Sequence, residues 1–163
     1  MQHAAELAGF FTAHGIWSVS DGGPLTPILA QESAAHGRNM LRFAADDLEE
    51  GVEQARQYLD ANLDSSACAA LVYDGFITLP SGRTDALLVE IRSYADPVAT
   101  LTMAVPYRRT EAPGGFAVHR PKFLEWQGPG TPDYAALGEA FLRGVDSHKE
   151  ASVVWAEHRD DSV

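Results

Sequence analysis

Three neighbouring stretches in the middle of the chain carry the pattern of β-strands. Residues 69–79, 84–94 and 98–107 are apolar and rich in β-branched and aromatic side chains. The first two are separated by residues 80–83 (PSGR), and the second and third by residues 95–97 (ADP). Connections this short make neighbouring strands run antiparallel. The centre of the chain therefore predicts a three-stranded antiparallel meander.

The two turns also predict a register for this meander. A loop at 80–83 places Tyr73 opposite Glu90, and a loop at 95–97 places Val89 opposite Met103. Period-two alternation then divides the side chains between two faces of the sheet. The expected core face holds Val72, Phe76, Leu87, Val89, Ile91, Leu101, Met103 and Val105. The other, which we call the polar-aromatic face, holds Tyr73, Glu90, Arg92, Tyr94, Thr100 and Thr102.

Shorter elements are expected before the meander. Residues 4–13 place apolar side chains on one side of a short helix, which His14-Gly15 would end. Residues 16–20 and 25–31 flank an Asp-Gly turn and predict a hairpin. Pro27 lies in the second arm of that hairpin, which makes this arm an edge or bulged strand. Residues 38–43 predict a third strand.

A capped, acidic helix is predicted between these strands and the meander. Asp46 or Asp47 would cap it, and a glutamate three residues later completes a capping box. Its apolar stripe has helical spacing and comprises Leu48, Val52, Ala55, Leu59 and Leu63. Six acidic residues lie between Asp46 and Asp60, against Arg56 as the one basic residue. They favour a solvated helix face, with a docking surface for a basic partner as the alternative.

After the meander, short strands and a last helix complete the pattern. Residues 116–119 and 122–126 predict short strands, and Asp133 opens a helix that runs to about His148. We expect the end of the chain, from about residue 157 to 163, to be frayed.

This order of elements predicts an α+β fold. We expect a single domain over residues 1–163, with an antiparallel sheet of about six or seven strands in two meanders. The order is helix, three strands, helix, three or four strands, helix. Two or three helices would pack mainly on one face of the sheet.

The charge balance narrows the classes of partner. The chain of 163 residues carries a formal net charge of −11 at pH 7. Nucleic-acid binding needs a basic surface to meet the phosphates, and an anionic membrane attracts basic segments. We therefore expect neither nucleic acid nor a membrane as a partner. The longest apolar runs also fall far short of the ~20 residues that cross a bilayer.

The first residues and the single cysteine predict a compartment. The start, MQHAAELAGFF, has no basic region and contains Glu6, unlike a secretory signal peptide. Cys68 has no second cysteine to pair with, and its alanine neighbours favour a small buried side chain over a reactive thiol. We expect a cytoplasmic protein. Its many alanines and preference for arginine over lysine are typical of a GC-rich bacterial genome.

The sequence contains no spacing that by itself indicates catalysis or metal binding. No two of the six histidines lie at i, i+2 or i, i+4, where two ligands would share one strand or helix face. No serine lies in a G-x-S-x-G elbow, and neither glycine-rich phosphate motif is present. We therefore predict no metal and no cofactor, and a non-catalytic role is favoured over an enzyme.

Three features nevertheless indicate candidate functional residues. Asp74 falls on the expected core face, either at a bulge that turns it to solvent or as a general base in a pocket. Glu90 and Arg92 project from the same face, either as a structural ion pair with neighbouring strands or as a site in which Arg92 binds an anion. The third feature is a basic cluster, which bonds the acidic helix or forms an anion site: Arg108, Arg109, His119, Arg120 and Lys122.

The order of elements resembles that of the small acidic chaperones of bacterial secretion systems, which are dimeric α+β proteins that bind another chain. The resemblance implies a protein partner or a homodimer, with the polar-aromatic face and the edge strand containing Pro27 as binding surfaces. The alternative is a small-molecule enzyme or binding protein, with Glu90 or Asp74 as acid/base and Arg92 as anion anchor. Its pocket would be lined by Tyr73, Tyr94 and His119, and the candidate catalytic residues are Asp74, Glu90 and His119. The candidate binding residues are Tyr73, Glu90, Arg92, Tyr94, Arg108, Arg109 and Arg120.

Overall fold

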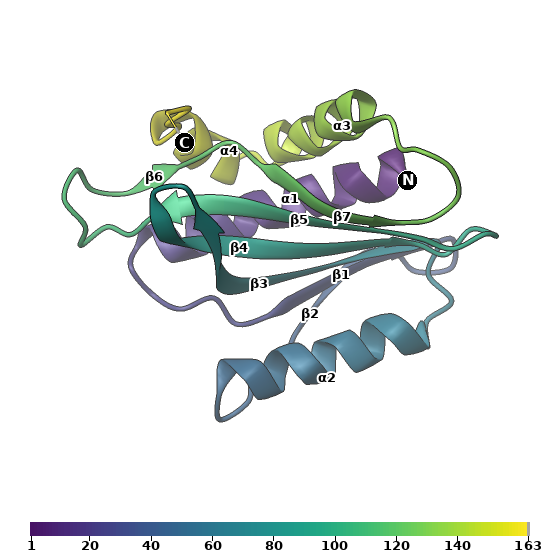
Figure 1. Cartoon of the computed structure of the whole chain (residues 1–163). Coiled ribbons are helices and arrows are strands. Elements are labelled where there is room, and N and C mark those ends of the chain that lie inside the picture. The colour runs from purple at the N-terminus through teal and green to yellow at the C-terminus, as the bar shows by residue number, and fades with distance from the viewer. Residues whose placement is uncertain (163) are drawn as a thin grey trace.

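A seven-stranded antiparallel sheet carries helices on both of its faces in the computed structural model, which describes residues 1–162 (Figure 1). The helices are α1 (Gln2–Ser20), α2 (Leu48–Ala61), α3 (Tyr134–Ser147) and α4 (Ala151–Glu157). The strands are β1 (Ile28–Ser33), β2 (Gly37–Arg42), β3 (Cys68–Leu79), β4 (Gly82–Ser93), β5 (Ala99–Arg108), β6 (Ala117–Val118) and β7 (Lys122–Gln127). The predicted α+β class is confirmed.

The strands are ordered β2-β1-β3-β4-β5 across the sheet, and β5 then pairs with both β6 and β7. The predicted central meander is β3, β4 and β5. The first predicted meander is instead a two-stranded hairpin, β1 with β2, and β1 joins the rest of the sheet by pairing with β3. The β6 strand lies beside the end of β5, at Tyr107, whereas β7 lies beside its first half.

The register of the meander was predicted correctly for one hairpin. Val89 pairs with Met103, as the 95–97 turn predicts. In the other hairpin Leu79 pairs with Gly82, so the turn has two residues rather than four, and Tyr73 lies opposite Leu88 instead of Glu90. Because this shift is an even number of residues, each side chain stays on its predicted face of the sheet.

The main hydrophobic core lies on the face that α1, α3 and α4 cover (Figure 1). The predicted core-face residues of β3, β4 and β5 pack there, except Phe76, which is 49% exposed near the end of β3. The helices contribute large side chains such as Leu7, Phe141 and Trp155. The opposite face is covered in part by α2, which buries Ala55 and Leu59 in a second, smaller cluster.

The predicted cap of α2 is confirmed. The Asp47 side chain accepts a hydrogen bond from the backbone N–H of Glu50 at 2.7 Å, which satisfies one of the free donors of the first turn. Asn62, with φ of 43°, ends the helix in the left-handed region.

The first helix is longer than predicted, and the first hairpin is displaced. Residues 16–20 were predicted as a strand. They are instead the last residues of α1, which continues through Gly15. A Cβ at Gly15 would lie 2.8 Å from Leu87 Cδ1, so this glycine allows α1 to approach the sheet closely. Pro27 precedes β1, which lies between β2 and β3; the edge strand is β2.

The last described residues are tied to β6. The backbone N–H of Val118 donates to the His158 carbonyl, and the backbone N–H of Asp160 donates to the Val118 carbonyl, each at 2.8 Å. The frayed end stays a prediction for the residues beyond Asp160, and Val163 lies outside the described residues. Within residues 1–162, no helix is long and apolar enough to cross a membrane.

Candidate functional site

The polar-aromatic face packs against α2 through a hydrogen-bonded cluster. Arg56 of α2 donates from Nη2 to Glu90 Oε1 at 2.7 Å and to Tyr73 Oη at 3.3 Å. Tyr73 in turn donates from Oη to the same Glu90 oxygen at 2.9 Å. Burial, together with the Glu90 carboxylate, raises the pKa of Tyr73 to about 12. The Glu90 carboxylate also raises the pKa of Arg56, so the Tyr73 phenol stays protonated and the Arg56 guanidinium stays charged at neutral pH.

The other two predicted members of this face also contact α2. Arg92 forms an ion pair with Asp60, and Tyr94 donates a hydrogen bond from Oη to the Leu59 carbonyl. Glu90 and Arg92 are each in an ion pair, but the partners, Arg56 and Asp60, lie on α2 and not on the neighbouring strands that the structural interpretation predicted. These contacts hold α2 against the polar-aromatic face of the sheet.

Asp74 forms a polar network near one end of the sheet. The β3–β4 register is continuous through Asp74, so the predicted bulge is wrong and the side chain stays on the core face. Its Oδ1 accepts a hydrogen bond from Tyr107 Oη at 2.8 Å, and Arg109 Nη2 lies 3.9 Å from Oδ2. Burial and then the Asp74 carboxylate raise the pKa of Tyr107. The Asp74 carboxylate, 11% exposed, is thus compensated by a phenol and a guanidinium.

The three arginines of the predicted basic cluster are paired internally, but with other partners than the acidic helix. Arg109 donates from Nε to Asp85 Oδ2 at 2.7 Å. Arg108 donates from Nε to the Gly115 carbonyl at 2.8 Å. Further ion pairs join Arg108 to Asp160 at 3.4 Å and Arg120 to Asp161 at 3.4 Å. The expected contact with residues 46–60 is therefore wrong, because β4 and the segment after α4 supply the carboxylates.

These side chains surround two different hollows. Arg108 and Arg109 line an open, polar hollow together with Asp85 and Tyr107. Arg120 lies at a second, mainly apolar pocket, and His119 contributes to the lining of both. The structure thus brings part of the predicted basic cluster to each site, while Tyr73, Glu90, Arg92 and Tyr94 lie at neither.

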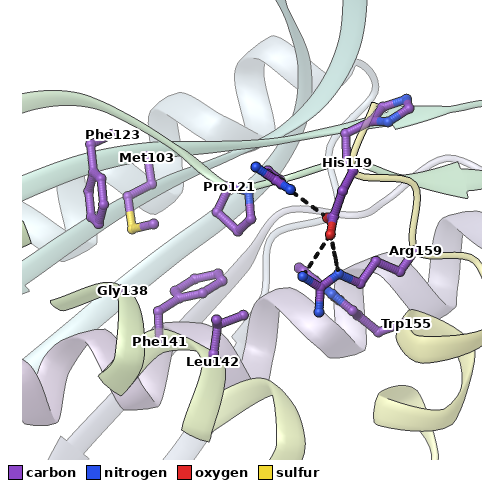
Figure 2. Close-up of a pocket in the computed structure, with 11 residues that line it drawn as sticks. Met103, His119, Pro121, Phe123, Gly138, Phe141, Leu142, Trp155 and Arg159 are labelled. Atoms are coloured by element: carbon purple, nitrogen blue, oxygen red, sulfur yellow. Dashed lines mark hydrogen bonds and ion pairs between the residues drawn. The ribbon is translucent and has the colours of Figure 1, made fainter. Parts of the chain in front are cut away.

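The apolar pocket lies between the sheet and the two C-terminal helices, and we call it the α3–α4 pocket (Figure 2). Its volume is about 250 Å³. Its walls combine Met103 of β5 and Phe123 of β7 with side chains of α3 and α4. The lining residues are Met103, His119, Arg120, Pro121, Phe123, Gly138, Phe141, Leu142, Trp155, Arg159 and Asp161. Hydrocarbon and aromatic surface meets three charged side chains here, an arrangement typical of small-molecule sites.

The charged side chains form an ion-pair triad (Figure 2). The Asp161 carboxylate accepts from Arg159 Nε at 3.0 Å, lies 2.8 Å from Arg159 Nη2, and lies 3.4 Å from Arg120 Nε. The Arg159 guanidinium, and then that of Arg120, lower the pKa of the Asp161 carboxyl. Both arginine side chains are more than half exposed, so the triad lies at the mouth of the pocket.

His119 is a buried ring beside this triad. Its Nδ1 lies 2.9 Å from the Asp160 carbonyl oxygen. A carbonyl oxygen only accepts hydrogen bonds, so Nδ1 carries a proton and donates it to this oxygen. Figure 2 shows the ring directed away from Met103 and Phe123, so it does not point into the apolar part of the pocket.

Sequence reasoning missed most of this pocket. Its apolar members were visible only as core positions of separate elements, and Arg159 and Asp161 fell in the segment predicted to fray. The α4 helix and the pairing of Arg159 with Val118 bring them to the pocket. No spacing in the sequence marks a site that is assembled from β5, β7, α3, α4 and the residues after α4.

The sequence also raised the questions of a metal site and of a reactive cysteine, and the structure bears on both. Among residues 1–162, no three His, Cys, Asp or Glu side chains are close enough to hold a metal ion together. Cys68 is buried in β3, and burial raises the pKa of its thiol to about 11, which keeps it protonated at neutral pH.

Comparison of the chain with protein-family models, with curated proteins and with solved structures finds no match.

Proposed function

We propose that the protein binds a small, mainly apolar molecule in the α3–α4 pocket and acts as a binding protein without catalysing a reaction. The observation that carries this proposal is the pocket itself, which places hydrocarbon walls beside a charged mouth. Hydrocarbon walls favour an apolar ligand because its surface leaves water on binding.

The volume of the pocket limits the size of the ligand. An engineered apolar cavity of about 150 Å³ holds benzene, whereas drug-sized ligands occupy pockets of roughly 300 Å³ or more. The α3–α4 pocket, at about 250 Å³, lies between these limits. We therefore expect a ligand of the size of a short alkyl chain or one substituted aromatic ring.

The chemistry of the walls favours binding over catalysis. The deeper lining residues, among them Met103, Phe123 and Phe141, offer no group that transfers protons or attacks a substrate. At the mouth, Asp161 forms ion pairs with both Arg120 and Arg159. Such groups can orient a ligand, which is the usual role of a few polar groups in an apolar pocket.

Methionine methyl NMR tests this proposal directly. The chain contains Met1, Met40 and Met103, of which Met103 lines the pocket. We expect 1-octanol, a neutral probe of suitable size, to shift the Met103 methyl signal in a saturable manner and to leave Met40 unchanged. Absence of a saturable shift with octanol and with short aromatic probes overturns the proposal.

A filling variant and a matched control strengthen the test. Leu142→Trp adds a ring at the edge of the pocket, where Leu142 is 42% exposed, and should abolish the shift. Val153→Trp introduces the same side chain at a 53% exposed position of α4 away from the pocket and should bind as the parent protein does. Equal binding by both variants would contradict the assignment of the site.

Self-association through β2 is a second candidate function, supported by a separate observation. β2 is an edge of the sheet, and Gly37, Arg38 and Asn39 in it are exposed. An exposed edge strand can pair with the same strand of a second copy. Light scattering after size exclusion should then give twice the chain mass of 17.6 kDa; a mass of 17.6 kDa at every concentration overturns this candidate.

A further inference from the structure

The mouth of the α3–α4 pocket holds more positive than negative charge. Two guanidiniums, Arg120 and Arg159, share one carboxylate, Asp161. This is a local excess of one positive charge in a chain whose net charge is −11. A guanidinium binds a carboxylate through parallel hydrogen bonds, which makes this group a selective partner for carboxylate ligands.

The two arginines do not hold Asp161 equally. Arg159 approaches the carboxylate with two nitrogens, Nη2 at 2.8 Å and Nε at 3.0 Å. The Nε of Arg120 lies 3.4 Å away, and the Arg120 side chain is 62% exposed. Exposed ion pairs contribute little to stability, so the contact between Arg120 and Asp161 can exchange for another anion at little cost.

We infer that the ligand of the pocket is an apolar monocarboxylate, and this inference rests on the proposed binding function. Its hydrocarbon part occupies the pocket against Phe123, Leu142 and Trp155, and its carboxylate replaces Asp161 as the partner of Arg120. Asp161 keeps its contacts with Arg159. With the ligand bound, two carboxylates balance two guanidiniums at the mouth.

Asp161 therefore acts as an internal competitor of the ligand. It occupies one side of Arg120 in the free protein, and it is a negative charge close to the ligand's carboxylate in the complex. Removing this charge should tighten the binding of an acid and leave the binding of the matching alcohol unchanged. This difference separates a carboxylate site from a merely apolar pocket.

Paired probes of equal chain length test the inference. Octanoate and 1-octanol are titrated at neutral pH and low salt into the full chain, with the Met103 methyl signal as the readout. We expect octanoate to bind the parent protein about 1.5-fold to fivefold more tightly than octanol, the range for a partly exposed charged contact. Asp161→Asn should raise octanoate affinity about threefold, and Arg120→Gln should remove the preference for the acid.

Matched variants control for the change in overall charge. Arg143→Gln removes a positive charge from α3 at a 56% exposed position paired with Glu6, and Glu139→Gln removes an exposed negative charge from the same helix. Neither residue lines the pocket, so both variants should keep the parent preference.

The outcomes separate the inference from the function on which it rests. If octanol binds as tightly as octanoate, or if Asp161→Asn leaves the ratio unchanged, the carboxylate inference is overturned while binding of an apolar ligand stands. If neither probe moves the Met103 signal in a saturable manner, the proposed function itself fails. If the control variants change the ratio as much as the test variants, the effect is one of general charge and the inference is again overturned.

Discussion

Two histidine rings meet where α1 passes the junction of α3 and α4. His14 Nδ1 lies 3.3 Å from His148 Nε2. At the outer nitrogens, Arg42 Nη2 lies 3.0 Å from His14 Nε2, and the Ala151 backbone N–H lies 3.2 Å from His148 Nδ1. Arg42 is a donor, so the His14 nitrogen that it faces holds a lone pair, and a proton added there would face another donor. The contact with Arg42 therefore opposes protonation of His14.

This arrangement predicts loss of stability in acid. Burial, and then Arg42 and His148, lower the pKa of His14. Between the folded and unfolded pKa values the unfolded chain binds more protons, so the free energy of unfolding falls as the pH drops below about 6.5. Glu150, 3.8 Å from His148 Nδ1, is the acidic group facing the pair and opposes this effect in part. Urea unfolding at pH 7.5 and pH 5.5 measures the change.

Two variants separate this pair from general acid effects. His14→Gln should reduce the difference in stability between the two pH values, whereas His36→Gln, at the exposed turn between β1 and β2, should keep it. An unchanged pH dependence in His14→Gln would contradict the assignment.

At the scale of single residues, the sequence showed which positions need an explanation but not their partners. Asp74 was identified because it interrupts the apolar face of the meander, yet its partner Tyr107 lies 33 positions away. His14 and His148 are separated by 134 positions, so a search for ligand spacing along one element cannot find them. Partners this distant are set by the packing of whole elements.

Among the elements, the backbones of α1 and α3 pack in close contact. A Cβ at Gly9 would lie 1.9 Å from the Phe141 carbonyl oxygen, and a Cβ at Gly144 would lie 2.0 Å from the Glu6 carbonyl oxygen. The two glycines face the opposite helix at the same crossing. They let the helices pack without side chains between them, which a larger residue would prevent.

Alanine at the crossing should therefore destabilise the protein. Gly→Ala normally stabilises a helix interior by about 1 kcal/mol. At Gly144 the contact with Glu6 must be relieved by moving the helices apart, so we expect Gly144→Ala to lower the free energy of unfolding by roughly 2–3 kcal/mol. Gly138→Ala, in the same helix with its nearest contact at 3.7 Å, should be neutral or stabilising. Similar effects of the two substitutions in chemical denaturation would contradict this account.

Element prediction failed where a glycine had a packing role. Gly15 was interpreted as a helix stop, and the β-branched residues after it as a strand, but the glycine lies inside α1 and faces Leu87. In contrast, the central strands and the cap at Asp47 follow from local pattern, and both are confirmed. Local signals are decisive for turns and caps, whereas tertiary contacts decide whether a helix continues through a glycine.

For the whole molecule, the two faces of the sheet are held by different interactions. Three helices share the large apolar core on one face, whereas α2 on the other face has a small cluster around Ala55 and Leu59. The ion pairs of Arg56 with Glu90 and of Arg92 with Asp60 supplement this cluster. Because α2 buries less apolar surface, we expect it to open locally before the rest of the domain unfolds.

Hydrogen exchange tests this order of opening. The amides of α2 should exchange faster than those of α3 in the parent protein. Arg56→Gln removes the charged contact with Glu90, whose side chain is 16% exposed, at a cost of about 1 kcal/mol after allowance for the partly exposed guanidinium. This corresponds to a roughly fivefold rise in the exchange rate of α2 amides. The α3 amides should keep their rates, because the opening does not involve the main core.

Substitution of the second carboxylate that pairs with Arg56 distinguishes a specific contact from a general change in charge. Glu53 also pairs with Arg56, at 3.4 Å, but its side chain is 60% exposed and lies on α2 itself. Glu53→Gln therefore breaks no contact between α2 and the sheet, and exchange in α2 should change by less than about twofold. If Glu53→Gln matches Arg56→Gln, or if α3 exchange rises together with α2, then α2 does not open as a separate unit, because a single cooperative transition would couple both faces of the sheet.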